Sequence, residues 1–309
     1  MVEILIGAGG WSYFNVPGDR LRAYASAFKT VEVNSTYYRI PPVSVVERWR
    51  KRVPDDFEFT VRCNQGLISR LQNEPVSSSL RLYDEMKEIC SVLDAKIMHI
   101  QIPSDFILNN PNLSKIEKFL SLIDTSRPGM AWEIRSPKNE DKDNILRILQ
   151  RHNIVHCIDL SREAPSASDN IIYSRLFGKG EHNIYQFTNT ELKEIDGKVR
   201  TSSASKAYLN FHGTRMYKDA ARISIYEATS IFPKVTKGIG ISSVIEVLKE
   251  DAQFPSTTSE LAKSQGWKVC EWNIGQQLHL SEILSKIEDK RFASINDLEF
   301  ELKHSIHSS

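Results

Sequence analysis

Eight short, strand-like runs alternate with helical stretches along residues 1–231, and this alternation restricts the fold more than any other feature of the sequence. The expected strands are Glu3–Ala8, Val31–Thr36, Phe57–Cys63, Ala95–Gln101, Met130–Ser136, Ile154–Leu160, Ile171–Phe177 and Lys206–His212. The expected helices are Leu21–Phe28, Val43–Arg52, Leu80–Leu93, Leu113–Ile123, Lys142–Arg151 and Tyr217–Ile231. This pattern predicts an α/β fold with a closed (β/α)8 TIM barrel, because eight strands are the number that closure needs. An open, doubly wound sheet is the alternative.

Polar side chains recur where the expected strands end. The stretch Val31–Pro42 shows this most clearly, because Glu32 and Asn34 alternate with valines and two prolines then stop the strand. The carboxyl ends of barrel strands form one rim, where working groups are normally found. The other polar residues expected at this rim are Arg62, Gln101, Glu133, Arg135, Asp159, Arg175 and His212. A half-buried strand with a solvated polar face is the alternative for any one of these positions.

Composition describes an ordinary soluble chain, with 40% hydrophobic residues, 26% charged residues and a net charge of +1. That charge gives no general signal for nucleic acid or membrane, although a local basic groove stays compatible with it. No apolar run approaches the roughly 20 residues of a spanning helix, and the first residues lack the basic start of a signal peptide. Four scattered cysteines without a Cys-x-x-Cys pair fit reduced thiols. We therefore expect a cytoplasmic protein without membrane contact.

The sequence changes character after Phe232. Residues 232–240 resemble a linker, and residues 241–309 are expected to form a small, all-helical module without strands. Its expected helices are Val244–Leu248, Ser256–Gln265, Leu280–Ile287 and Ile295–Leu302, and Thr257 and Ser294 stand where such helices start. Mixed charges on this module predict packing or contact with a protein partner.

A series of motifs carries a family resemblance across most of residues 1–231. The motifs are Gly10-Trp-Ser-Tyr13, Glu32-Val-Asn-Ser-Thr-Tyr-Tyr38, Phe57-Glu-Phe-Thr-Val-Arg62, Gln101-Ile-Pro-Ser-Asp-Phe106, Glu133-Ile-Arg135, Asp159 and Arg175-Leu-Phe-Gly178. Together they resemble the YecE-like family, domain of unknown function 72. The resemblance implies a TIM barrel similar in shape to endonuclease IV, and some members have been proposed to bind DNA. The C-terminal module resembles domain of unknown function 2795.

Two positions depart from the family pattern. Phe177 replaces the histidine that usually follows strand seven, and His212 stands in a Phe-His-Gly sequence where the family has Phe-Asn-Asn. One interpretation is that His212 replaces the lost imidazole from the neighbouring strand. The alternative is drift at a site whose function has changed.

Arginines and aromatic residues near the rim indicate an anionic ligand. The planar forks of Arg62, Arg135 and Arg175 suit phosphate or carboxylate. The alternative is that they only neutralise Glu32, Glu133 and Asp159. Aromatic side chains on the first two loops, Trp11 and Tyr37 among them, could stack a base or sugar ring beside these arginines, or simply pack over the barrel.

Several types of chemistry stay open at this rim. Glu32, Glu133, Asp159 and His212 are the candidates for acid–base catalysis. The three carboxylates could also hold a divalent cation such as Mg²⁺ or Mn²⁺, although the arginines argue against tight binding, and no metal ligands are assigned. Zinc is not expected, because His99 and His156 lie inside strands. The leading hypothesis is binding of nucleic acid or a small phosphorylated ligand, with phosphodiester hydrolysis if catalytic. A non-catalytic nucleic-acid-binding module and a sugar-phosphate-converting enzyme are the alternatives.

Overall fold

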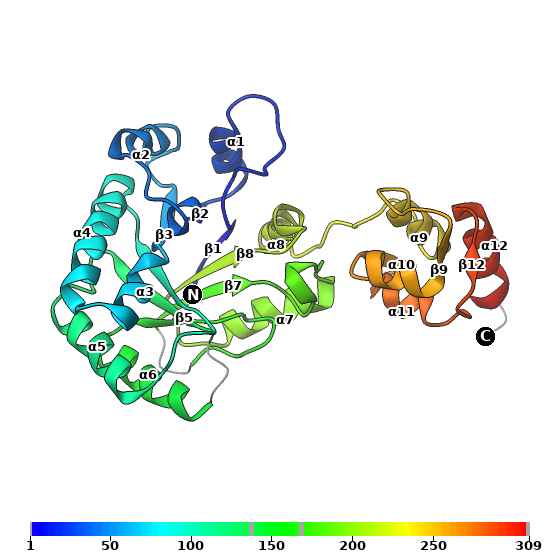
Figure 1. The fold of residues 1–309 in the computed structure, drawn as a ribbon. Coiled ribbons are helices and arrows are strands. Elements are labelled where there is room, and N and C mark those ends of the chain that lie inside the picture. Colours follow the sequence, from blue (N-terminus) through cyan, green and yellow to red (C-terminus); the bar gives the residue numbers. More distant parts are fainter. Residues whose placement is uncertain (1, 136–138, 167–169, 307–309) are drawn as a thin grey trace. The chain divides into compact units, whose positions relative to one another are not determined.

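The computed structural model describes residues 2–135, 139–166 and 170–306 (Figure 1). The chain divides into two compact units. One comprises Met1–Leu176 with Lys198–His212, and the other comprises Phe177–Gly197 with Gly213–Ser309. The domain boundaries predicted from the sequence, at residues 231 and 241, remain predictions. No helix within the described ranges is long and apolar enough to cross a membrane.

The first unit contains a barrel of eight parallel strands. In chain order they are β1 (Glu3–Ala8), β2 (Thr30–Val33), β3 (Glu58–Arg62), β4 (Ile97–Ile102), β5 (Gly129–Ile134), β6 (Val155–Cys157), β7 (Ile171–Leu176) and β8 (Lys206–Phe211). Neighbouring strands pair in the order β6-β5-β4-β3-β2-β1-β8-β7. The barrel closes between β6 and β7 through a parallel bridge of Ile158 with Ser174. The predicted TIM-barrel fold is thereby confirmed.

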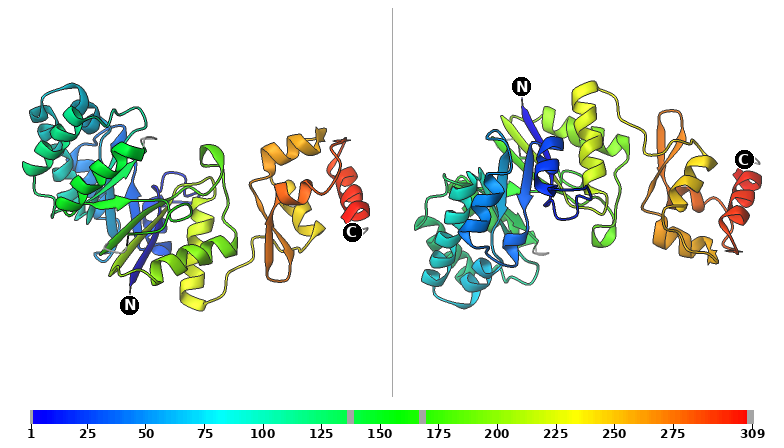
Figure 2. Two further views of the ribbon diagram at one scale, coloured as in Figure 1. Left: turned by 90° about the horizontal axis from the view of Figure 1, so that it is seen from below. Right: turned by 90° about the horizontal axis from the view of Figure 1, so that it is seen from above.

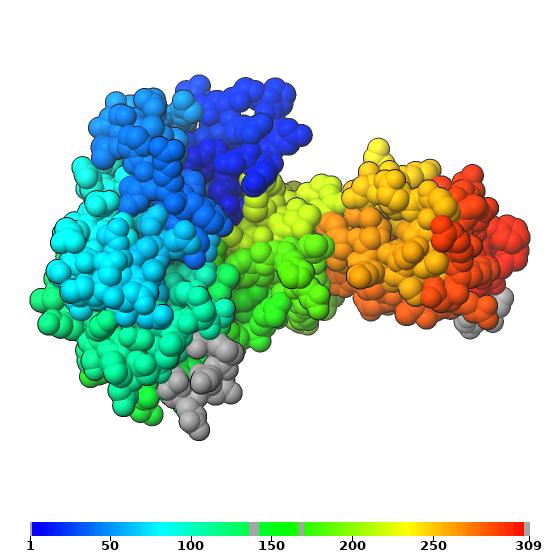
Figure 3. Space-filling model, viewed as in Figure 1, coloured from blue at the N-terminus to red at the C-terminus, as the bar shows by residue number. Residues whose placement is uncertain are grey.

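Helices surround this barrel on the outside. Those of the first unit are α1 (Arg20–Ala27), α2 (Val43–Arg50), α3 (Gly66–Asn73), α4 (Val76–Leu93), α5 (Asn110–Ser121) and α6 (Asn139–Arg151). Two further views of the ribbon show helices α3 to α6, coloured cyan to green, outside the strands (Figure 2). In the space-filling view, α2 to α5 present a continuous outer surface (Figure 3).

The second strand ends earlier than the sequence predicts. It stops at Val33, and Ser35–Tyr37 forms the 3₁₀ turn η1. The Thr36 hydroxyl lies 2.8 Å from the carbonyl oxygen of Val33 and 2.6 Å from that of Arg62, and the hydrogen that it shares between them ties the turn to the end of β3. This side-chain bond offers the backbone an alternative to a continued strand. The turn brings Asn34 and Tyr37 next to Arg62 at the end of β3.

Side chains that point into the barrel form an apolar layer beneath a polar one. The apolar cluster contains Leu5, Ile97, Ala131, Cys157, Tyr173 and Tyr208, all buried. Successive inward positions lie two residues apart on each strand. The next inward residues on β4, β5 and β7 are therefore His99, Glu133 and Arg175, which makes the upper layer polar.

The second unit contains the elements η2 (Glu181–Asn183), α8 (Met216–Thr229), α9 (Ile241–Leu248), β9 (Ser256–Thr257), α10 (Thr258–Gln265), β10 (Val269–Asn273), β11 (Gln276–His279), α11 (Leu280–Leu284), β12 (Arg291–Phe292) and α12 (Ile295–Ile306). Helix α7 (Asn189–Arg200) crosses the boundary between the units. The Thr257–Glu260 capping box starts α10, as predicted.

The expectation of an all-helical C-terminal module is wrong. Residues 241–306 also form two antiparallel pairs, β10 with β11 and β12 with β9. A turn at Gly275, whose φ of +77° suits glycine, joins β10 to β11. Strands of two to five residues are too short to show a clear alternation, so helical spacing dominates the sequence pattern.

Candidate functional site

An arginine bridges two carboxylates in the polar layer of the barrel. The Nε of Arg175 donates to Glu32 Oε1 at 3.2 Å, and its Nη1 donates to Glu133 Oε2 at 2.5 Å. Glu32 is fully buried and Arg175 is 2% exposed. The hydroxyl of Tyr173, one inward position below Arg175, donates to Glu32 Oε2 at 2.7 Å. The three charged side chains therefore form one buried ion-pair network.

Two histidines complete this network. His212 Nε2 lies 3.2 Å from both Glu32 Oε1 and Arg175 Nε. His99 lies between the carboxylates, with Nε2 3.2 Å from Glu133 Oε2 and Nδ1 3.8 Å from Glu32 Oε2. Neither His99 ring nitrogen forms a well-aligned hydrogen bond, and the ring stacks on Tyr173. His99 is not among the predicted site residues, because it lies inside an expected strand, although its place two residues before Gln101 indicates the same inward face.

The backbone of Gly9, in the loop after β1, passes close to the side chains of His212 and Asn34. A Cβ atom at Gly9 would lie 2.3 Å from Cε1 and Nδ1 of His212 and 2.5 Å from Nδ2 of Asn34. Any side chain at this position would therefore collide with both residues. The glycine loop after β1 creates the space that the imidazole occupies.

The network fixes the protonation of its members. Burial acts to raise the pKa of Glu32 and Glu133, but Arg175 and the neighbouring histidines outweigh burial and hold both pKa values well below their usual range. Burial and Arg175 lower the pKa of His212 to about 4, and they also lower the pKa of His99. At neutral pH both carboxylates are ionised and both imidazoles are neutral.

A second group surrounds Arg62 at the end of β3. The Nη2 of Arg62 donates to Gln101 Oε1 at 2.5 Å, and Nη1 lies 3.4 Å from Asn34 Oδ1. The guanidinium carbon lies 3.6 Å from the centroid of the Tyr37 ring. Arg62 is 8% exposed, and burial and Arg175 lower its pKa. No carboxylate of the described residues lies within ion-pair distance of Arg62, whose polar partners are neutral amides.

A family model decides the relationship of the barrel to known proteins. The model described as "Protein of unknown function DUF72" matches residues 5–227. The chain belongs to the DUF72 family. The C-terminal module lies outside this match, and its resemblance to domain of unknown function 2795 stays a prediction.

Similar proteins agree with this assignment. The UPF0759 protein YunF of Bacillus subtilis is 32% identical over 92 residues, which are 27% of this chain and 33% of YunF. The chain thus covers about a third of that relative. Crystal structures of DUF72 proteins from Enterococcus faecalis (EF0366) and Thermotoga maritima (TM1631) are 17% and 20% identical. Each gives a TM-score of 0.58, with 75% and 73% of this chain covered and 99% of each structure, and both support the fold alone.

Two other predicted rim residues of this DUF72 barrel, and the predicted loop residue Trp11, have different surroundings. Arg135 donates from Nε to Glu133 Oε1 at 2.5 Å, and its side chain is 40% exposed. Asp159 Oδ1 accepts from the backbone and hydroxyl of Ser161, at 2.9 and 2.6 Å, so the carboxylate shapes its own loop. Trp11 packs edge-on against Trp49 of α2, with ring centroids 5.2 Å apart. Arg135 therefore extends the network, whereas Asp159 and Trp11 contact other parts of the barrel.

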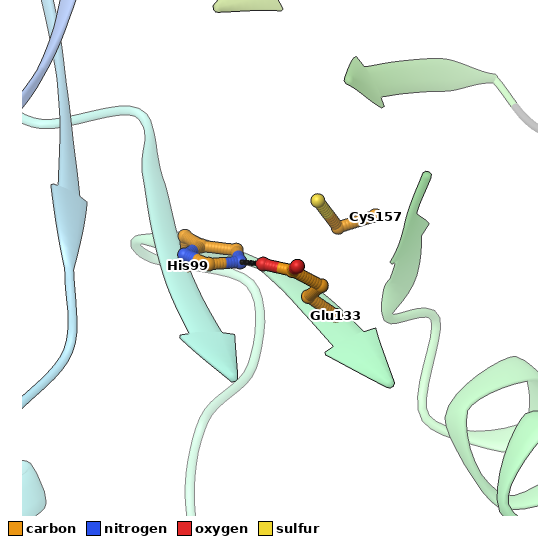
Figure 4. A group of neighbouring side chains, drawn as sticks. All are labelled: His99, Glu133 and Cys157. Atoms are coloured by element: carbon orange, nitrogen blue, oxygen red, sulfur yellow. Dashed lines mark ion pairs between the residues drawn. The ribbon is translucent and has the colours of Figure 1, made fainter. Parts of the chain in front are cut away.

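The ligand atoms of His99, Glu133 and Cys157 lie within 4.8 Å of one another (Figure 4). This is the metal-compatible group of the described residues, and the carboxylate set Glu32, Glu133 and Asp159 does not form one. Both oxygens of Glu133 already accept from arginines, Oε1 from Arg135 and Oε2 from Arg175. Burial raises the pKa of Cys157 well above its usual value, which favours the thiol over the thiolate. The guanidiniums therefore occupy the place that a cation would need.

Proposed function

We propose that the carboxyl end of the barrel binds a phosphate-bearing ligand, with nucleic acid as the best candidate, and that Arg62 holds the phosphate. The observation that carries this proposal is a buried guanidinium that has no ion pair with any carboxylate of the described residues. A buried cation is unfavourable by several kcal/mol unless an anion compensates it. Arg175 compensates Glu32 and Glu133, whereas Arg62 contacts amides and an aromatic ring. A phosphate in the barrel mouth would supply the missing anion.

The contacts of Arg62 suit exchange for a ligand. Its 3.4 Å contact with Asn34 is longer than a normal N–H···O hydrogen bond, so a phosphate oxygen would compete well for Nη1. Guanidinium and phosphate form bidentate hydrogen bonds, which are stronger than those between neutral groups. The face of Tyr37 holds the guanidinium plane in place, which reduces the entropy lost on binding.

A second candidate function is hydrolysis of the bound phosphodiester, favoured by the environment of His212. A neutral imidazole can accept a proton from water, and the carboxylate of Glu32 would stabilise the imidazolium that forms. Glu32 and Glu133 themselves are weak bases, since their pKa values lie well below the usual range. With a pKa of about 4, His212 is a weak base as well, and it differs from the glutamates in having the carboxylate of Glu32 beside it to offset the charge that its protonation creates. A divalent cation such as Mg²⁺ or Mn²⁺ stays an untested cofactor.

Titration calorimetry with inorganic phosphate and with a short oligonucleotide tests the binding proposal. We expect the Arg62→Met variant to lose at least about tenfold in affinity for both ligands. Wild-type binding of the oligonucleotide should weaken steeply with salt, because counterions are released. The control is Arg81→Met on the exposed face of α4. Equal affinity of wild type and Arg62→Met would contradict the proposal.

A cleavage assay on the same oligonucleotide, with and without Mg²⁺ or Mn²⁺, separates hydrolysis from binding alone. If His212 is the base, His212→Gln binds the oligonucleotide but does not cleave it. Binding by the wild type without cleavage under any of these conditions would leave a non-catalytic binding module.

A further inference from the structure

A pocket beside Arg62 is lined mainly by amide, hydroxyl and aromatic side chains, with the single carboxylate of Asp105 among them. It has a volume of about 500 Å³, within the range of small-molecule sites. Its walls come from the turn after β2, from the N-terminal turn and following turns of α3, and from the loop after β4. The lining residues are Tyr37, Gln65, Gly66, Ile68, Ser69, Gln72, Asn73, Gln101, Pro103, Asp105 and Phe106. No cation is among them, so phosphate would not prefer this pocket itself.

Two residues connect this pocket to the proposed phosphate position. Gln101 accepts a hydrogen bond from Arg62, and Tyr37 stacks on the guanidinium; both side chains also line the pocket. A ligand whose phosphate lies at Arg62 would therefore place the adjacent chemical group in the pocket. The pocket and the arginine are neighbouring parts of one site.

The amide groups of the pocket leave hydrogen-bond donors available. Gln101 Oε1 accepts from Arg62, and Gln72 Oε1 accepts from the backbone nitrogen of Ile107 at 3.2 Å. Within the described ranges, the amino groups of these two side chains have no hydrogen-bond partner. Glutamine side chains beside aromatic rings are the groups that proteins use to bind the edges and faces of nucleobases.

We infer that this pocket binds one unstacked nucleobase of the ligand, so that the protein prefers nucleotides and single strands to duplexes. The inference rests on the proposed phosphate site at Arg62 and adds the chemical class of the group beside it. A base paired in a duplex cannot enter a pocket of this kind without leaving its stack. A sugar phosphate lacks the planar ring that would lie against Tyr37.

The test compares the affinities of the full chain for inorganic phosphate, ribose 5-phosphate and nucleoside monophosphates, measured by calorimetry. We expect the nucleotides to bind about tenfold tighter than the other two ligands, because base stacking adds to the phosphate contact. Fluorescence anisotropy should show the same order for a single-stranded oligonucleotide relative to its blunt duplex.

A variant that fills the pocket separates the two parts of the site. Ser69 is exposed on α3 and lines the pocket, so Ser69→Phe adds bulk there without disturbing the core. We expect this variant to lose the preference for nucleotides and to retain the affinity for inorganic phosphate. The matched control is Ser77→Phe, at an exposed position of α4 outside the lining residues, which should behave as the wild type.

Each outcome has a separate meaning. Wild-type protein that binds inorganic phosphate and nucleotides equally, or a Ser69→Phe variant that keeps the preference, would overturn the base-binding inference and leave the phosphate site intact. Absence of binding to all of these ligands would overturn the proposed function and this inference together.

Discussion

Replacing Arg175 with methionine tests the ion-pair network most severely. Methionine keeps the apolar stem of the side chain but leaves Glu32 and Glu133 without the guanidinium that holds both. Removing one partner of a buried ion pair typically lowers stability by about 3–5 kcal/mol. The upper part of this range is expected, since Glu32 is fully buried and the side chain of Glu133 is only 13% exposed.

The effect should depend on pH with a definite sign. In the wild type the pKa of both carboxylates is lower in the folded state than in the unfolded state. Their contribution to stability is therefore present above the ordinary carboxylate pKa and is lost as pH falls through the lowered values. In Arg175→Met, burial without the guanidinium raises both pKa values, so protonation stabilises the variant. The difference in free energy of unfolding should thus shrink as pH falls from 7 toward 4.

Urea denaturation of both proteins, followed by circular dichroism at several pH values, measures this difference. Arg81→Met on α4 is the control, and Arg175→Met combined with Glu133→Gln should recover part of the loss because one stranded charge is gone. A loss below about 1 kcal/mol at neutral pH, or a loss that stays constant with pH, would refute the reasoning.

Two other changes have defined outcomes. Gly9→Ala should lower the free energy of unfolding by about 1–3 kcal/mol, because the new Cβ collides with His212 and Asn34. The control Gly197→Ala on α7, where no atom lies within 4 Å of the new Cβ, should instead raise it by up to about 1 kcal/mol. Equal effects of the two substitutions in thermal denaturation would contradict this expectation. Thr257→Ala should lower the stability of the protein by about 1 kcal/mol through loss of the α10 capping box. An unchanged urea midpoint for the transition that reports the C-terminal module would show that the cap is unimportant.

The barrel could be predicted from the sequence because its signal is repeated. Each of the eight strands is a short apolar run, and helical spacing separates most of them, so errors at single boundaries do not change the count. Helix α3, at Gly66–Asn73, escaped prediction, since it follows β3 after a few residues and has no side-chain N-cap. The short strands of the C-terminal module were not predicted either, because two to five residues are too few to show the alternation of apolar and polar residues that indicates a strand.

The candidate site was only partly predictable. Strand-end position alone brought together Glu32, Glu133, Arg175 and His212, since parallel strands share one rim. It could not reveal that Arg175 lies between the two carboxylates, because pairing depends on side-chain conformations across several strands. Asp159 shows the limit of the argument, since the residue lies at the rim but its carboxylate bonds to Ser161 in its own loop.

The central claim is that a phosphate group completes the environment of Arg62. Anomalous diffraction from crystals of the full chain soaked in tungstate, an analogue of phosphate, tests it most directly. We predict a peak within hydrogen-bond distance of the Arg62 guanidinium, with the contact to Asn34 broken and the Arg175 network unchanged. An Arg62 that keeps its bonds to Asn34 and Gln101, at tungstate concentrations that saturate binding in solution, would contradict the claim.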